Sequence, residues 1–152
     1  MRLLGDCIVR IQHIGSTAVP GLMAKPTVDI LLEVPADTDF DEIIVLFQQH
    51  SEYICLHGEG LTNKNEPLCI LKGYTDKGFA ERVFHIHVRE AEIYDEPIFR
   101  NYLIAHPEIA TEYATLKHKL KNEYEHDRDR YTAAKGEFIK AAVRKAKEEN
   151  GV

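Results

Sequence analysis

Residues 13–29 contain the residue types that could bind a phosphate group and a metal ion together. A β-type apolar run ends at Gly15, the hydroxyl residues Ser16 and Thr17 follow, and a second apolar run carries Asp29. Glycine lets the backbone approach a ligand closely, and free N–H groups at the start of a helical turn attract anions. A carboxylate on the next strand could hold a metal ion against the same phosphate. This stretch therefore predicts a Mg²⁺–nucleotide site.

The same residues also have structural interpretations, which the sequence leaves open. Ser16 could be a plain N-cap of the turn after Gly15, and Asp29 could pair with a nearby basic residue. An acid between apolar strand neighbours is costly without a partner, which favours a functional role for Asp29. Lys25, in the loop before Asp29, could meet a phosphate or simply lie in solvent. We expect Gly15, Ser16 and Lys25 to contact the ligand, with Thr17 as a further candidate.

Two predicted strands, 27–34 and 82–89, carry a second set of reactive side chains. Residues alternate between the two faces of a strand, so each run has an apolar face and a polar face. The polar faces hold four residues able to bind a metal ion or a phosphate group: Asp29, Glu33, His85 and His87. If the two strands are neighbours in one sheet, these side chains gather beside the turn at Ser16.

The sequence resembles the GrpB family, a branch of the nucleotidyltransferase superfamily with a Gly-Ser turn and a later Asp-x-Asp or Asp-x-Glu pair. The most specific match runs from Gly15 to Leu22 and continues through Ala24-Lys25-Pro26 and Asp29-Ile30. Further matches follow in family order over nearly the whole chain: 85–88, 99–103 before Pro107, 113–117 and 131–139. The resemblance implies a nucleotidyltransferase-like fold, within a family whose activity is poorly defined.

The chain departs from the superfamily pattern at the carboxylate pair. The second acid of the pair falls at Leu31, which cannot bind a hard cation such as Mg²⁺. Glu33 is the remaining metal-ligand candidate beside Asp29, but it lies roughly 6–7 Å further along the strand. The third acid of the superfamily has no clear counterpart, and His85 and His87 stand in that region. Imidazole suits Zn²⁺ or another transition metal better than Mg²⁺.

Three functions are consistent with this pattern. The first is a protein that binds a nucleotide or another phosphorylated small molecule and uses Mg²⁺ to transfer a nucleotidyl group. Asp29 would ligate the metal as a catalytic residue, and His87 would be the second catalytic residue, while His85 contacts the ligand. The second is a non-catalytic ligand-binding or regulatory module with a degenerate site. The third is a hydrolase with Zn²⁺ or another transition metal at His85 and His87.

Two Tyr–Lys pairs at helical spacing supply further candidates for phosphate binding. Lys117 follows Tyr113 by four residues, and Lys135 follows Tyr131 in the same way, so each pair shares a helix face. We expect the tyrosines in the core, with their hydroxyl groups hydrogen-bonded. The lysines could reach over the site as phosphate clamps or remain solvated.

The spacing of apolar residues predicts an α+β fold, with a mixed β-sheet covered by helices and a helical C-terminal half. Strands are predicted over 7–14, 27–34, 53–56, 68–74 and 82–89, and a helix over 39–50. From Asp95 the apolar period becomes 3.6, which indicates a short helix before Pro107 and then two long antiparallel helices. We expect a single domain over residues 1–148 and a frayed tail over 149–152.

Composition restricts the partners and the compartment. The 152 residues carry a net charge of −6, which argues against a nucleic-acid duplex as the main partner. A nucleotide held with Mg²⁺ is still compatible with that charge. Cys7, Cys55 and Cys69 form no CxxC motif, which favours reduced thiols. We see no leader and no apolar run of membrane length, so we expect a cytoplasmic protein without a membrane partner.

The first residues favour association with a second copy of the chain. GrpB-like proteins commonly have a helix ahead of the first strand, whereas little more than Met1–Gly5 precedes it here. Either the chain is a trimmed piece, or another surface covers that face of the sheet. A missing helix exposes apolar area, which favours a homodimer.

Overall fold

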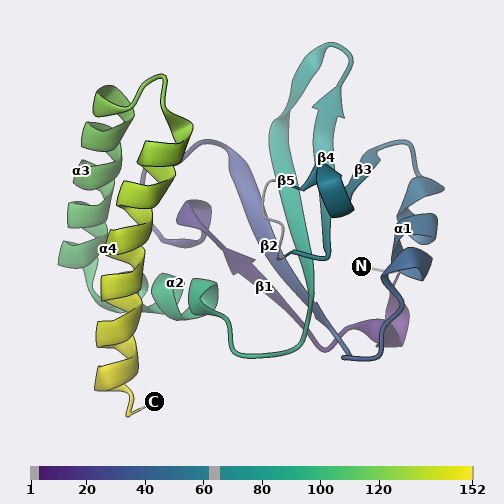
Figure 1. The fold of residues 1–152 in the computed structure, drawn as a ribbon, viewed down its shortest axis with the longest axis horizontal. Coiled ribbons are helices and arrows are strands. Elements are labelled where there is room, and N and C mark those ends of the chain that lie inside the picture. Colours follow the sequence, from purple (N-terminus) through teal and green to yellow (C-terminus); the bar gives the residue numbers. More distant parts are fainter. Residues whose placement is uncertain (1–3, 62–65, 152) are drawn as a thin grey trace. The chain divides into compact units, whose positions relative to one another are not determined.

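The computed structural model describes residues 4–61 and 66–151, which form two compact units (Figure 1). The first, here named the sheet unit, contains the described residues up to Ala18 and residues 24–93. The second, the helical unit, contains residues 19–23 and 94–151. The single domain expected over 1–148 stays a prediction, because compactness does not show which parts fold independently.

The sheet unit contains a mixed five-stranded sheet and the helix α1 (Figure 1). The strands lie in the order β1–β2–β5–β4–β3, where β2 and β5 are parallel and the other neighbouring pairs are antiparallel. The bounds are β1 Arg10–Ile14, β2 Thr27–Val34, α1 Phe40–Gln48, β3 Tyr53–Leu56, β4 Leu68–Thr75 and β5 Gly78–Glu90. The predicted mixed sheet is confirmed.

Local sequence signals explain most of these boundaries. β2 coincides with the strand predicted over 27–34, which a proline bounds on each side. α1 begins after Asp39, whose side chain accepts a hydrogen bond of 2.9 Å from the N–H of Asp41 and so caps the helix. β1 is shorter than the predicted 7–14, because a 3₁₀ turn over Gly5–Cys7 precedes it and pairing begins at Arg10.

One face of the sheet forms the core of the sheet unit together with α1. Alternate residues of β2 and β5 lie on this face, as predicted, and α1 contributes three buried residues. The buried cluster consists of Leu4, Leu32, Val34, Ile43, Ile44, Phe47, Leu68, Ile70, Ile86 and Val88. Since apolar side chains fill this face, the polar side chains of β2 and β5 lie on the opposite one.

The helical unit contains three α-helices among the described residues: α2 Asp95–Ala105, α3 Pro107–Glu123 and α4 Arg128–Glu149. Pro107 lies in the first turn of α3, where its missing N–H breaks no helical hydrogen bond. α3 and α4 lie side by side and run in opposite directions, as predicted (Figure 1). The α+β class and the helical C-terminal half are therefore confirmed. No helix in the described part of the chain is long and apolar enough to cross a bilayer.

Candidate ligand site around Gly15 and Asp29

The turn after β1 stands directly against the carboxylate of Asp29. Ile14 pairs with Asp29 across β1 and β2, and the chain then turns at Gly15 with a φ of +75°. A Cβ atom at Gly15 would lie 2.7 Å from Oδ2 of Asp29, so only glycine leaves room for that carboxylate. A 3₁₀ turn over Ser16–Ala18 follows, closed by a bond of 3.1 Å from the N–H of Ala18 to the carbonyl of Gly15. The structure thus brings the predicted turn and the predicted acid together.

Thr17 ties this turn to the beginning of β2. Its hydroxyl donates a hydrogen bond of 3.0 Å to the carbonyl of Thr27 and lies 2.9 Å from Nε2 of His13. These contacts indicate that Thr17 positions the turn and that His13 on β1 holds the Thr17 side chain. The half-buried Ser16 begins the turn itself. Ligand contacts of Ser16 and Thr17 stay predictions.

The parallel pairing of β2 with β5 places the two histidines beside Asp29. The register sets Asp29 opposite His85 and Leu31 opposite His87. Oδ1 of Asp29 lies 3.5 Å from Nδ1 of His85 and 3.5 Å from Nε2 of His87. The side chains of Asp29 and His85 retain about 30% of their exposure, so solvent and a ligand can reach them. The strand adjacency on which the predicted polar face depends is therefore confirmed.

His85 is held by Tyr74 from the neighbouring strand β4. The Tyr74 hydroxyl lies 2.8 Å from Nε2 of His85, and the two rings are stacked with an interplanar angle of 16°. Burial lowers the pKa of His85; the Asp29 charge opposes this effect, and His87 adds to it. His85 is therefore a neutral imidazole at neutral pH, suited to a hydrogen bond with a ligand rather than to charge pairing.

His87 is a cation at neutral pH and lies between two carboxylates. Its Nδ1 is 2.7 Å from Oε1 of Glu66, and its Nε2 faces Asp29. Burial opposes the charged form, but the hydrogen bonds to Asp29 and Glu66 outweigh it and raise the pKa of His87 to about 9. Burial also opposes the charge on Glu66, yet His87 and Arg89 together hold the pKa of that carboxyl below its ordinary value.

Glu33 is fully buried and has partners on β1. Nε of Arg10 lies 2.9 Å from Oε2 of Glu33, and Nε2 of Gln12 donates a bond of 3.0 Å to the same oxygen. A second Arg10 nitrogen donates to Oε1 at 3.2 Å, so both carboxylate oxygens are bound by protein groups. These contacts account for the burial of Glu33 without a metal ion, and its role as a metal ligand stays a prediction. Leu31, between the two acids, is also fully buried.

The three lysines predicted to bind phosphate lie in different parts of the chain. Lys25 is exposed in the loop before β2. Lys117, in the helical unit, lies over the Tyr113 ring at 5.0 Å and donates a bond of 3.4 Å to the carbonyl of Met23. Burial, with a contribution from Lys135, lowers the pKa of Lys117. Each i, i+4 Tyr–Lys pair is in contact, as its spacing predicts, since Lys135 likewise lies 5.3 Å from the centre of the Tyr131 ring. Phosphate binding by the three lysines stays a prediction.

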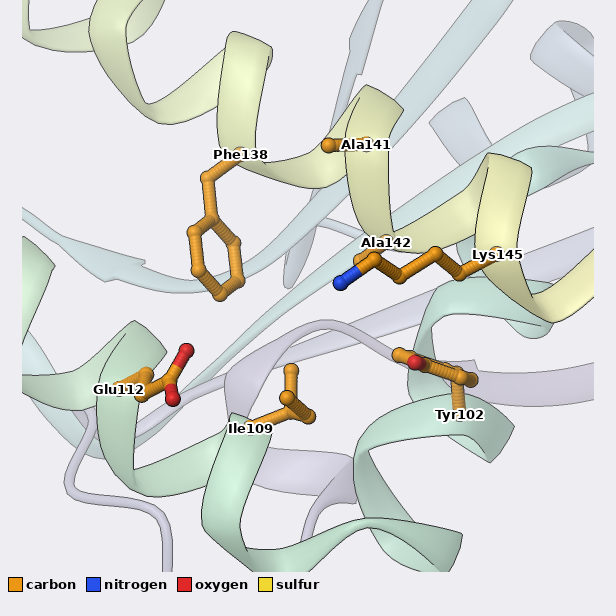
Figure 2. Close-up of a pocket in the computed structure, with 7 residues that line it drawn as sticks. All are labelled: Tyr102, Ile109, Glu112, Phe138, Ala141, Ala142 and Lys145. Atoms are coloured by element: carbon orange, nitrogen blue, oxygen red, sulfur yellow. The ribbon is translucent and has the colours of Figure 1, made fainter.

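The helical unit has a partly open cavity of its own, lined by residues of α2, α3 and α4. Figure 2 shows its lining, which consists of Tyr102, Ile109, Glu112, Phe138, Ala141, Ala142 and Lys145. Its volume is about 60 Å³. Pockets for small-molecule ligands usually hold roughly 300–1,000 Å³. This cavity is therefore too small for a nucleotide.

Sequence reasoning missed three residues around the histidines. Glu66 and Tyr74 hold His87 and His85 in place, and Cys69 pairs with His87 across β4 and β5. Alternation in β4 could have placed Cys69 on the polar face. No local pattern identifies Glu66, which precedes β4 in an irregular segment.

Comparison with known proteins identifies the family to which the chain belongs. The family model described as GrpB protein matches residues 1–145, and the chain therefore belongs to the GrpB family. The crystal structure of conserved protein GrpB from Enterococcus faecalis is similar, with a TM-score of 0.76 and 29% sequence identity. That match covers 99% of this chain and 87% of the other.

Curated relatives agree with this assignment. The UPF0157 protein YqkA of Bacillus subtilis is 36% identical over 151 residues, which are 95% of this chain and 40% of that protein. The glutamate-rich protein GrpB of Alkalihalophilus pseudofirmus is 31% identical over 140 residues, covering 90% and 78% of the two chains. The chain spans 40% of YqkA and 52% of the UPF0157 protein PA4798 of Pseudomonas aeruginosa, about half the length of these two relatives.

Proposed function

We propose that this protein binds a phosphorylated small molecule, with a nucleotide as the first candidate, at the turn over Gly15–Ala18. Asp29 contacts a Mg²⁺ ion that the ligand carries, and the two histidines contact the ligand itself. The observation that carries this proposal is the close approach of Gly15 to the Asp29 carboxylate, which leaves no room for a Cβ atom. A partly exposed backbone turn and a metal-binding carboxylate are the two parts that a Mg²⁺–phosphate group requires.

The charges around Asp29 support a ligand that brings its own cation. His87 is positively charged and has two acidic partners, Asp29 and Glu66, while Arg89 lies 3.3 Å from Glu66. The cluster of these four side chains is therefore close to neutral at neutral pH. In such a cluster Asp29 attracts a free Mg²⁺ ion weakly, whereas a Mg²⁺ ion already bound to phosphate gains Asp29 as one additional ligand.

A second candidate, binding without nucleotidyl transfer, is favoured by the environment of Leu31. Transfer requires two or three carboxylates around the metal ions. Leu31 is fully buried where the second carboxylate of the superfamily would stand, and the His87 imidazolium lies 3.5 Å from Asp29. A single available acid suits binding of a Mg²⁺ complex better than catalysis on it.

Calorimetric titration with ATP, GTP, CTP and UTP tests the binding site. We expect Asp29→Asn to weaken binding of the Mg²⁺ complex at least tenfold, about 1.4 kcal/mol, and to leave binding in EDTA unchanged or stronger. Asp76→Asn, in the exposed turn between β4 and β5, is the matched control and should bind as the wild type does. Equal Mg²⁺-dependent affinity in all three proteins, with circular dichroism unchanged, would reject the role of Asp29.

Pyrophosphate release separates the two candidates. The binding module predicts no release from any of the four triphosphates at any Mg²⁺ concentration. Mg²⁺-dependent release that disappears in Asp29→Asn would instead establish attack on the α-phosphate at this site, with the nucleotidyl group passing to water or to an acceptor hydroxyl.

A further inference from the structure

Three different metal-binding side chains meet on the polar face of the sheet, beside the proposed phosphate site. A carboxylate oxygen of Glu66, the sulfur of Cys69 and a ring nitrogen of His87 all lie within 4.8 Å of one another. Among residues 4–61 and 66–151, no other group of three His, Cys or acidic side chains brings its ligand atoms this close together. Both Glu66 and Cys69 are buried, with relative exposures of 7% and 6%.

The sheet fixes the positions of these side chains. Cys69 and His87 are directly paired residues of the antiparallel strands β4 and β5, and Glu66 lies two residues before β4. Zn–S distances are about 2.3 Å and Zn–N or Zn–O distances about 2.0–2.2 Å, so two ligands of a tetrahedral Zn²⁺ ion stand roughly 3.3–3.6 Å apart. Small side-chain rotations are therefore enough to bring all three donor atoms to one ion, with no change in backbone pairing.

The surroundings of His87 match those of a metal-bound histidine. Nδ1 lies 2.7 Å from Oε1 of Glu66, which is another member of the cluster. The other nitrogen, Nε2, lies 3.5 Å from Oδ1 of Asp29. A metal-ligating histidine usually donates its second N–H to a carboxylate, which fixes the tautomer and the ring orientation. Asp29 is placed to supply that carboxylate.

Cys69 is the residue that an ion-pair network alone does not require. Glu66 is already paired with His87 and with Arg89, whose Nε lies 3.3 Å away. Cys69 adds a sulfur donor directly opposite His87 in the sheet, and Cys sulfur is a preferred ligand of Zn²⁺.

We propose that Glu66, Cys69 and His87 bind a divalent transition metal ion of borderline softness, with Zn²⁺ as the first candidate. Three protein ligands leave one tetrahedral position for water. The ion replaces the thiol proton and the proton between His87 and Glu66, and both protons pass to solvent. A thiolate ligand disfavours Mg²⁺. The site does not depend on the proposed binding of a phosphorylated ligand.

Metal titration of the full chain without a His-tag tests this site. After dialysis against EDTA and removal of the chelator, we expect one Zn²⁺ ion to bind per chain in competition with a chromophoric chelator. Co²⁺ should bind in the same place and give the near-ultraviolet charge-transfer band of a thiolate ligand. Cys69→Ser should abolish this band and weaken Zn²⁺ binding at least tenfold, and Glu66→Gln should also weaken Zn²⁺ binding.

Cys55→Ser is the matched control, because Cys55 lies on β3 and belongs to no such cluster of the described residues. It should keep the wild-type affinity and the wild-type Co²⁺ spectrum. Absence of Zn²⁺ binding, unchanged affinity in Cys69→Ser, or a wild-type Co²⁺ complex without a thiolate band would each overturn the site. Because these titrations contain no nucleotide, they fail or succeed independently of the nucleotide titrations with Asp29→Asn.

Discussion

Raising the pH from 6.5 to about 9.5 is expected to destabilise the wild-type chain by about 3 kcal/mol more than the His87→Gln variant. The effect arises because the folded chain stabilises the charged form of His87. Its pKa is raised from 6.5 to about 9. Asp29 and Glu66 supply this stabilisation against the opposing effect of burial.

The direction of the pH dependence follows from the raised pKa. Below pH 6.5, His87 is protonated in both the folded and the unfolded chain, and its charge contributes fully to the free energy of unfolding. As the pH rises toward about 9, the unfolded chain loses its proton first, and the contribution disappears when the folded chain loses its own. The lowered pKa of Glu66 arises from the same ion pair with His87, so its contribution to stability is not added to that of His87.

Urea unfolding at pH 6.5, 8 and about 9.5, with EDTA present, measures this effect. In Glu66→Gln, the change in the free energy of unfolding with pH should lie between those of the wild type and His87→Gln. This substitution removes one of the two carboxylates that face His87. The comparison uses the change in stability with pH, so a constant loss of stability in a variant does not affect it. If the free energy of unfolding changes equally with pH in the wild type and in His87→Gln, the folded chain does not favour the charged form of His87.

Gly15→Ala is expected to destabilise the chain by about 1.5–3.5 kcal/mol and to remove binding of the phosphorylated ligand. A φ of +75° costs an alanine roughly 1–2 kcal/mol. The new Cβ would also lie 2.7 Å from Oδ2 of Asp29, so the carboxylate must rotate from its position, at a further cost of roughly 0.5–1.5 kcal/mol. The same displacement separates Asp29 from the turn.

Gly21→Ala is the matched control for this substitution. Gly21 has almost the same φ, +76°, but a Cβ there would meet nothing within 4 Å. It should therefore show the backbone cost of about 1–2 kcal/mol alone, with ligand affinity unchanged. Denaturant unfolding and calorimetry on both variants measure the two quantities. Equal stability loss and equal ligand affinity in the two variants would contradict the contact between Gly15 and Asp29.

Much of the sheet could be predicted from the sequence, because alternation and strand ends are local signals. β2 coincides with its prediction, since apolar residues recur at every second position between two prolines. The same alternation placed Asp29 on the polar face of β2 and His85 and His87 on the polar face of β5. Adjacency of the Gly15 turn to Asp29 depends on the pairing of β1 with β2, which residues 15–26 connect, so it needed the structure.

The cross-strand neighbours of the histidines could not be predicted, because an irregularity in the hairpin changes the strand register. Near the turn, Thr75 pairs with Gly78 and Tyr74 with Phe79. Counting onward from those pairs would place Glu66 opposite His87. The register shifts between Lys72 and Tyr74, and Cys69 pairs with His87 instead.

Glu33 shows a different limit of sequence reasoning. Its type and face made it a candidate metal ligand, but side chains from β1 bind both of its oxygens. Cross-strand pairing of Arg10 with Glu33 determines this contact, and pairing depends on the register rather than on residue type.

Backbone amide NMR during titration with the tightest-binding Mg²⁺–nucleoside triphosphate tests the central claim most directly. If the Gly15 turn and Asp29 form one ligand site, the largest shift changes will fall on residues 15–18 and 29, with smaller changes at His85 and His87. Asp29→Asn should reduce all of them together. Changes centred on α3 and α4, or scattered over the surface without the turn, would contradict the proposed site.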